Sequence, residues 1–331
     1  MKYQGVNLAS FPAQINYALT HFDASALSPS ISKTKTVYLC GLGGSGIAGR
    51  LVSNYLRSRS KLHIITVADY QLPATLEADA LVICSSYSGN TEETLSMFDQ
   101  ALQKSCQMIC ISSGGTLSTL AQQHNIPLFL AESGYQPRMA LGYSLTYLLL
   151  ILHQINDEDI QSELASIGIL LKDPKPFQDR ASSIISDLTL SNTDRLQVLT
   201  DGPGESASLR FAQQLNENVK LPTHVHPIPE MCHNVIETIT NDKADTSPWL
   251  FLESYTQPRN QKRFDFLAQL LTEKGRKFYR LKADCSDLKT LMDTVYMFDW
   301  LSLLLADKNG VNSSQIPNIL ALKAYLNDNA S

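Results

Sequence analysis

The sequence predicts an α/β protein built from two doubly wound parallel-sheet domains. In the first half, short apolar runs alternate with helical patterns, and a similar pattern restarts in the second half. A length of 331 residues suits two domains of ordinary size, and 44% hydrophobic residues are enough to give each a core. We place the domains at residues 1–155 and 156–331.

Five apolar runs in the first half are short enough to be strands, and four of them lead into a helical pattern. The runs are TVYLCG, LHIITV, ALVICSS, QMICISS and IPLFLA; the helical patterns are GIAGRLVSNYLRS, TEETLSMFDQALQK, TLSTLAQQH and the segment after QPRMALGYS. Such alternation indicates a parallel sheet with helices on both faces. The apolar stretch from Tyr143 to Ile155 is too short to span a bilayer comfortably, so we expect a buried helix there.

The second half begins after a more polar segment, with LQVLTDGPGESASLRFAQQL. Placing Gly202-Pro203-Gly204 against Gly41-Leu42-Gly43 also matches WLFLESYTQP with ALVICSSYSGN. Two matches in the same order indicate an internal duplication. The second copy has Gln257, Pro258 and Arg259 where the first has Gly89, Asn90 and Thr91.

The polar cluster SSYSGNT lies between a predicted strand and a predicted helix. Backbone N–H groups and hydroxyls at such a junction converge on one point, and the positive end of the helix dipole lies behind them, which favours an anion such as phosphate. Asn90, three residues before Glu93, is expected to cap the helix. The alternative is an ordinary polar turn, because Ser, Gly and Asn also dominate turns.

The preceding loop, GLGGSG, formally satisfies the dinucleotide-binding pattern Gly41-x-Gly43-x-x-Gly46, with Asp69 as the candidate ribose-binding acid. Asp69 lies somewhat beyond the usual spacing of about 20 residues. A dinucleotide site also leaves the second, hydroxyl-rich loop unexplained. Two such loops at adjacent strand ends fit a phosphate monoester better.

Charge and cysteine usage limit the kinds of partner. A net charge of −5 and a pI near 5.8 argue against non-specific binding to nucleic acid or to an anionic membrane. The six cysteines contain no C-x-x-C pair, so we expect reduced, packed thiols. The N-terminal segment lacks the pattern of a secretory signal, and we expect a cytoplasmic location.

GLGGSGIAG together with SSYSGNTEET resembles the sugar isomerase (SIS) domain, whose phosphosugar loop has the pattern S-x-S-x-x-T, here Ser86, Ser88 and Thr91. QPRMALGYS, QLNENVKLP and PEMCHN further resemble the bifunctional phosphoglucose/phosphomannose isomerases, and the resemblance covers nearly the whole chain in order. It implies two flavodoxin-like SIS domains. It also implies a phosphate site formed by Gly44, Ser45 and the three loop hydroxyls.

The resemblance implies an aldose–ketose isomerase that interconverts glucose 6-phosphate and mannose 6-phosphate with fructose 6-phosphate through an enediol. Glu217 matches the general base, and Arg138 matches the arginine that would stabilise the enediolate. His233 matches a ring-opening histidine contributed by the partner subunit, so a homodimer is expected. Lys323 matches a lysine that helps at the ring oxygen. The reaction requires no metal or redox cofactor.

Other functions remain open at this point. A non-catalytic SIS sensor of phosphosugars would not need a base, and other SIS isomerases act on heptose or pentose phosphates. His224 and His226 form an H-x-H pattern, but no Cys, Asp or Glu at ligand spacing accompanies them, so no metal site is expected. No single residue determines the choice between C2 epimers.

Overall fold

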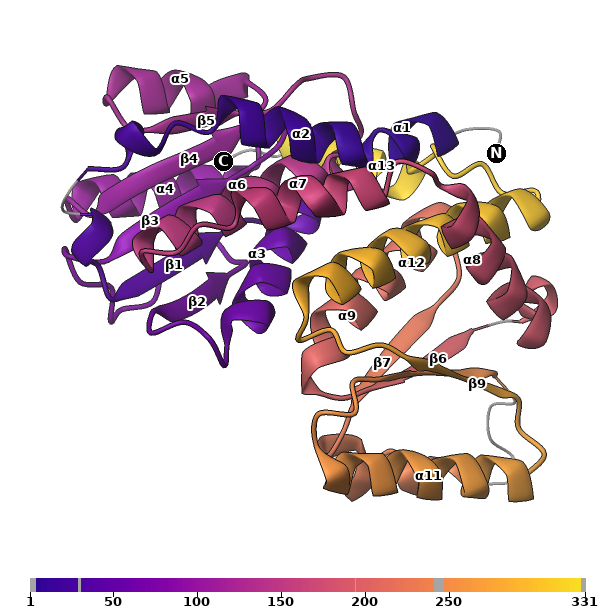
Figure 1. The fold of residues 1–331 in the computed structure, drawn as a ribbon. Coiled ribbons are helices and arrows are strands. Elements are labelled where there is room, and N and C mark those ends of the chain that lie inside the picture. Colours follow the sequence, from indigo (N-terminus) through magenta and orange to yellow (C-terminus); the bar gives the residue numbers. More distant parts are fainter. Residues whose placement is uncertain (1–3, 29–30, 194, 241–246, 329–331) are drawn as a thin grey trace. The chain divides into compact units, whose positions relative to one another are not determined.

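The computed structural model describes residues 4–28, 31–193, 195–240 and 247–328, and these residues form two units (Figure 1). The first unit contains residues 7–174 and 285–292. The second contains residues 4–6, 175–284 and 293–328. Each has one parallel sheet flanked by helices, which confirms the predicted fold class.

The sheet of the first unit has the strand order β2-β1-β3-β4-β5, and all its strands are parallel. Because the order reverses between β1 and β3, the loops that follow these two strands lie on either side of a topological switch point, where α/β proteins bind ligands. The strands are β1 (Thr36–Cys40), β2 (His63–Val67), β3 (Leu81–Ser85), β4 (Gln107–Ser112) and β5 (Leu128–Leu130).

Helices cover both faces of this sheet. One face packs against α4 and α5 through a core that includes Val82, Cys84, Phe98 and Leu117. On the other face, α3 contacts Leu39 at Gly49, and α6 packs on α3. The helices are α2 (Phe11–His21), α3 (Gly43–Leu56), α4 (Glu92–Gln103), α5 (Gly115–Gln123), α6 (Leu141–Ile155) and α7 (Gln161–Leu170); α1 (Gly5–Ala9) joins the two units in sequence.

The second unit repeats the plan with the strand order β7-β6-β8-β9. Helix α11 packs on one face around Phe251 and Phe264. Helix α9 covers the other face, where Phe211 stacks on Phe298 of α12 with ring centroids 4.2 Å apart. The elements are β6 (Leu196–Thr200), β7 (Thr223–Pro227), β8 (Trp249–Glu253), β9 (Phe278–Lys282), α8 (Lys175–Asp187), α9 (Glu205–Gln214), α10 (Ile236–Ile239), α11 (Pro258–Glu273), α12 (Leu288–Lys308) and α13 (Pro317–Asp328).

The buried helix expected from the apolar stretch is confirmed, since every residue of α6 except Gln154 is buried. All six cysteines lie in described segments and are free thiols. The packed environment expected for them holds for four, whereas Cys106 and Cys232 are half-buried. Among the described residues, no helix is both long enough and apolar enough to cross a bilayer.

Candidate functional site

The loops that follow β1 and β3 are in direct contact. A Cβ atom on Gly41 would lie 2.7 Å from the Ser85 carbonyl oxygen, so this approach excludes any side chain. The Ser45 hydroxyl, at the start of α3, accepts a hydrogen bond of 3.1 Å from the Tyr87 backbone N–H. The structure therefore brings the glycine loop and the hydroxyl loop together at the switch point.

The hydroxyls of the second loop gather at the amino end of α4. Ser86 Oγ and Thr91 Oγ1 are 2.9 Å apart, and Ser86 is buried. Ser88 is exposed, and its Oγ accepts a bond of 3.3 Å from the Asn90 N–H. The positive end of the α4 dipole lies behind these groups and favours a bound anion.

Asn90 does not cap α4 as the sequence suggests, and this prediction is wrong. The N-cap of α4 is Thr91. Asn90 Oδ1 instead accepts bonds from the N–H and hydroxyl of Thr116, at 2.9 and 3.0 Å, and so satisfies the first turn of α5. Asn90 follows Gly89, whose φ of +70° turns the chain toward that helix.

Arg138 lies in the same unit, on a short turn η3 (Pro137–Met139) that precedes α6. The turn packs directly on the glycine loop, because a Cβ on Gly44 would lie 2.6 Å from the Pro137 carbonyl oxygen. Arg138 is 4% exposed. A buried cation next to the glycine loop is the group that a developing oxyanion or a phosphate would need.

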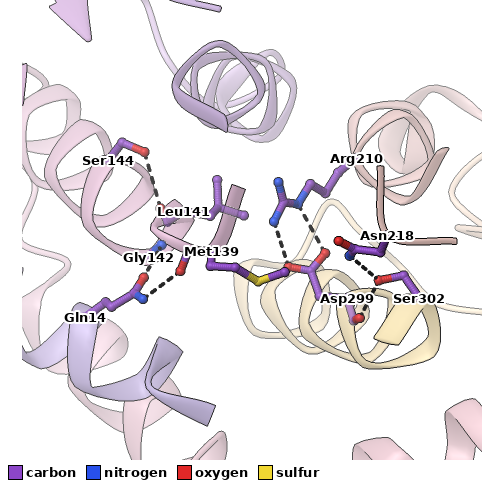
Figure 2. Close-up of polar contacts among 9 residues, drawn as sticks. All are labelled: Gln14, Met139, Leu141, Gly142, Ser144, Arg210, Asn218, Asp299 and Ser302. Carbon is purple, nitrogen blue, oxygen red and sulfur yellow. Dashed lines mark hydrogen bonds and ion pairs between the residues drawn. The ribbon is translucent and has the colours of Figure 1, made fainter. Parts of the chain in front are cut away.

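Gln14 on α2 holds this turn in place, and sequence reasoning missed it. Its Nε2 donates to the Met139 carbonyl at 2.8 Å, and its Oε1 accepts from the Gly142 N–H at 3.0 Å (Figure 2). Gln14 is fully buried. Its partners lie 125 and 128 residues away in sequence, so no local pattern identifies it.

Behind the two loops is a small cavity of about 10 Å³, which is room for about one water molecule. Ser85 Oγ lines it and has no hydrogen-bond partner among the described residues. Tyr143 lines it as well and donates to Glu132 Oε2 at 2.6 Å, while burial raises the pKa of Tyr143. The cavity is too small for a sugar phosphate.

Glu217, in the second unit, lies on a π-helical turn, η6 (Leu215–Val219), that continues α9. Its side chain is half-buried. Lys220 ends the turn in a left-handed conformation, and its Nζ donates to the carbonyls of Glu217 and Gln315. π-Helical turns inside helices are rare and occur frequently at functional sites.

Two buried contacts fix this segment on α12 (Figure 2). Arg210 forms a bidentate pair with Asp299, with Nε–Oδ1 3.1 Å and Nη2–Oδ2 2.9 Å, and both side chains are at most 2% exposed. Asn218, next to Glu217, donates from Nδ2 to Ser302 Oγ at 2.9 Å. Sequence reasoning missed these residues, because helical pattern alone does not show which helices pack together.

The other two candidate residues are exposed. His233 ends a short 3₁₀ helix, η7 (Glu230–His233), and Lys323 lies on α13. The structure thus gathers the five phosphate-loop candidates and Arg138 in the first unit. It places Glu217, His233 and Lys323 in the second unit.

The H-x-H pattern lies on β7, where His226 Nε2 bonds the Gln197 side-chain oxygen at 2.7 Å. Burial, together with His224, lowers the pKa of His226 to about 4. In the part of the chain that the structure describes, no three His, Cys, Asp or Glu side chains are grouped to hold a metal ion.

Comparison with known proteins gives matches over nearly the whole chain. Residues 30–151 match the SIS domain, and residues 179–326 match the bacterial phospho-glucose isomerase C-terminal SIS domain. The bifunctional phosphoglucose/phosphomannose isomerase of Caldicellulosiruptor bescii is 30% identical over 332 residues, covering 96% of this chain and 97% of the relative. The enzyme of that name from Aquifex aeolicus is 29% identical, with coverages of 93% and 96%.

Among solved structures, the C-terminal domain of glucosamine-fructose-6-phosphate aminotransferase from Francisella tularensis has the same fold. It superposes with a TM-score of 0.70 at 15% identity, covering 96% of this chain and 98% of that one.

Proposed function

The chain belongs to the bifunctional phosphoglucose/phosphomannose isomerase family and consists of two SIS domains, and we propose that it interconverts glucose 6-phosphate and mannose 6-phosphate with fructose 6-phosphate. The observation that carries the proposal is the set of hydroxyls at the switch point of the first unit. Ser86 and Thr91 lie 2.9 Å apart at the start of α4, with Gly44 and Ser45 in the adjoining first turn of α3. In this proposal they bind the phosphate, with Ser88 at the solvent side.

The proposed chemistry moves a proton between C2 and C1 of the opened sugar. Glu217 takes the proton from C2 of the aldose and returns it to C1, so that an enediolate forms between the two steps. Arg138 stabilises the negative oxygen of that enediolate, because a buried guanidinium needs no reorganisation as the charge develops. The Arg210–Asp299 pair keeps the segment that carries the base on α12.

We also propose that His233 opens the sugar ring in the partner subunit of a homodimer, with Lys323 at the ring oxygen. Two features support an interface. His233 is exposed, and α13 presents Leu320, Leu322 and Tyr325 with 57 to 66% of each side chain exposed. Apolar groups that remain exposed along one helix are typical of an interaction surface.

The first experiment is a coupled assay with glucose 6-phosphate and mannose 6-phosphate in parallel, with and without EDTA. Comparable turnover of both sugars in EDTA is the expected result. Turnover of only one sugar would reduce the proposal to a single epimer, and loss of activity in EDTA would contradict the metal-independent mechanism.

The second experiment replaces Glu217 by glutamine, which keeps the shape of the side chain and removes the base. Turnover and exchange of the C2 proton with solvent deuterium should fall by roughly two to four orders of magnitude, while phosphosugar binding persists. Glu163→Gln, an exposed glutamate on α7, is the matched control. If the unmodified protein binds fructose 6-phosphate but shows neither turnover nor exchange, it is a sensor and not an isomerase.

A further inference from the structure

A cavity in the second unit lies at the amino ends of its strands. It measures about 280 Å³, near the lower end of the roughly 300–1,000 Å³ typical of ligand pockets. Gln197 and His224 reach it from the second positions of β6 and β7, and Trp249 from the first position of β8. The loops after β6 and β8 leave from the opposite ends of these strands, and no residue proposed for phosphate binding or catalysis lines the cavity.

One wall of the cavity is apolar. Trp249, Ile239 and Leu271 line it and are at most 6% exposed, and Val235 adjoins them from the segment before α10. The Trp249 and His226 rings lie 5.4 Å apart with an interplanar angle of 32°. Two rings in this arrangement provide a surface on which a flat apolar group can pack.

Part of the polar wall is a neutral pair of side chains. His226 and Gln197 form a hydrogen-bonded pair, and the low pKa of His226 keeps its imidazole uncharged. Such a pair offers hydrogen-bonding groups without requiring a counter-charge.

Arg276 is the only Lys, Arg, Asp or Glu among the described residues that line the cavity. It is half-buried and follows α11. A guanidinium has five N–H donors in a planar fork that matches a carboxylate, so it can hold a ligand in addition to a protein acceptor. A single cation beside an apolar wall indicates a ligand with one negative group on an apolar body.

We propose that this cavity binds a small organic carboxylate with a flat apolar body, its carboxylate on Arg276 and its body against Trp249. The phosphate-loop residues are absent from its wall, so this site is distinct from the sugar-phosphate site and does not depend on the isomerase proposal.

Trp249 itself can report binding, because the chain has only one other tryptophan. For the experiment, Trp300, which is buried on α12, is replaced by phenylalanine in the full-length protein. Trp249 is then the only tryptophan whose emission is recorded. The probe is benzoate. Benzamide is the control that keeps the ring but has no charge, and acetate is the control that keeps the carboxylate but has no ring. Benzoate should change Trp249 emission saturably, benzamide should bind at least about tenfold more weakly, and acetate should give no saturable change.

Two variants identify the contacts. Arg276→Gln should weaken benzoate binding about tenfold or more and leave benzamide unchanged, whereas Arg263→Gln, on α11 outside the cavity wall, should leave both unchanged. Val235→Phe, which narrows the cavity, should weaken both probes. No saturable response to benzoate up to about 10 mM overturns the proposal, as does equal affinity for benzoate and benzamide.

Discussion

The segment after β3 in the first unit and the segment after β8 in the second occupy the same place in their sheets. They differ in that only the second has a carboxylate that accepts hydrogen bonds from its serine among the described contacts. In the first, Ser86 and Thr91 bond each other and no carboxylate accepts from them among the described contacts. In the second, Ser254 donates to Asp201 Oδ2 from its backbone N–H, at 3.3 Å, and from its hydroxyl.

Asp201 is therefore an internal acceptor at this junction of the second unit. It follows β6 directly and is 1% exposed, and burial raises the pKa of its carboxyl while the bonds from Ser254 oppose that shift. Thr256 Oγ1 completes the group, 3.0 Å from Ser254 Oγ. Both copies keep the backbone junction, but in the second an internal carboxylate accepts the bonds that the proposed phosphate would accept in the first.

The largest expected effect tests the backbone of the two junctions. Gly89 has φ +70°, and a Cβ there would lie 1.8 Å from the Gly114 carbonyl oxygen. Gly89→Ala should therefore lower the free energy of unfolding by at least about 3 kcal/mol, measured by denaturant titration. Gly202→Ala, after β6 in the second unit, is the control for a glycine in open space, since nothing lies within 4 Å of its Cβ position. Equal losses in both variants would show that the close approach at Gly89 is not the cause.

An intermediate effect tests which copy binds substrate. The double variant Ser86→Ala with Thr91→Ala should raise KM for glucose 6-phosphate by about 10- to 100-fold. In the proposed site, each substitution removes one hydrogen bond to the charged phosphate. In the second copy, Ser254 and Thr256 match Ser86 and Ser88, and Ser254→Ala with Thr256→Ala should leave KM unchanged.

Calorimetry on the unmodified protein should accordingly give one phosphosugar per chain. Two equivalent sites, or an unchanged KM in the first double variant, would place the phosphate elsewhere.

The smallest expected effect is the loss of stability of the second unit at acidic pH, through His226. The pKa of His226 in the second unit is about 4, below its ordinary value of 6.5, so the unfolded chain binds more protons between these values. This contribution to stability is complete above pH 6.5 and is lost as the pH falls toward 4. Allowing for partial exposure, the loss is roughly 1 kcal/mol by pH 5.

Unfolding midpoints of the unmodified protein and His226→Gln, compared at pH 7 and pH 5, measure that loss. The unmodified protein should lose more stability on acidification than the variant. Parallel pH profiles would show that His226 is not the responsible group.

The sequence predicts the central strands of both sheets well, because a parallel strand buried on both faces is a continuous apolar run. All residues of β3 and β8 are buried, and both were expected. The two strands that sequence reasoning left unassigned, β7 and β9, lie at the edges of the second sheet, where most side chains are only half-buried. The sequences THVHP and FYRLK mix polar and apolar residues and so lack a continuous apolar run, whereas the edge strand β2 keeps a largely apolar run in HIITV.

The candidate site also contains residues that the sequence predicts and residues that it does not. Loop residues such as Ser86 and Thr91 can be predicted because strand, polar cluster and helix are contiguous in sequence. Gln14 and the Arg210–Asp299 pair cannot, since their roles arise from contacts 89 to 128 residues apart. The π-helical turn at Glu217 also has no sequence pattern, because it depends on how Asn218 reaches Ser302 on α12.

The Arg210–Asp299 pair also restricts how this protein can evolve. Removing either partner leaves the other charge buried and unpaired, at a cost of about 3–5 kcal/mol, whereas replacing both with apolar residues of similar volume is often neutral. Selection would therefore eliminate a substitution at one of these positions before a compensating substitution at the other could arise. Helices α9 and α12 form an epistatic pair, in which the identity of residue 210 determines which residues selection can accept at position 299.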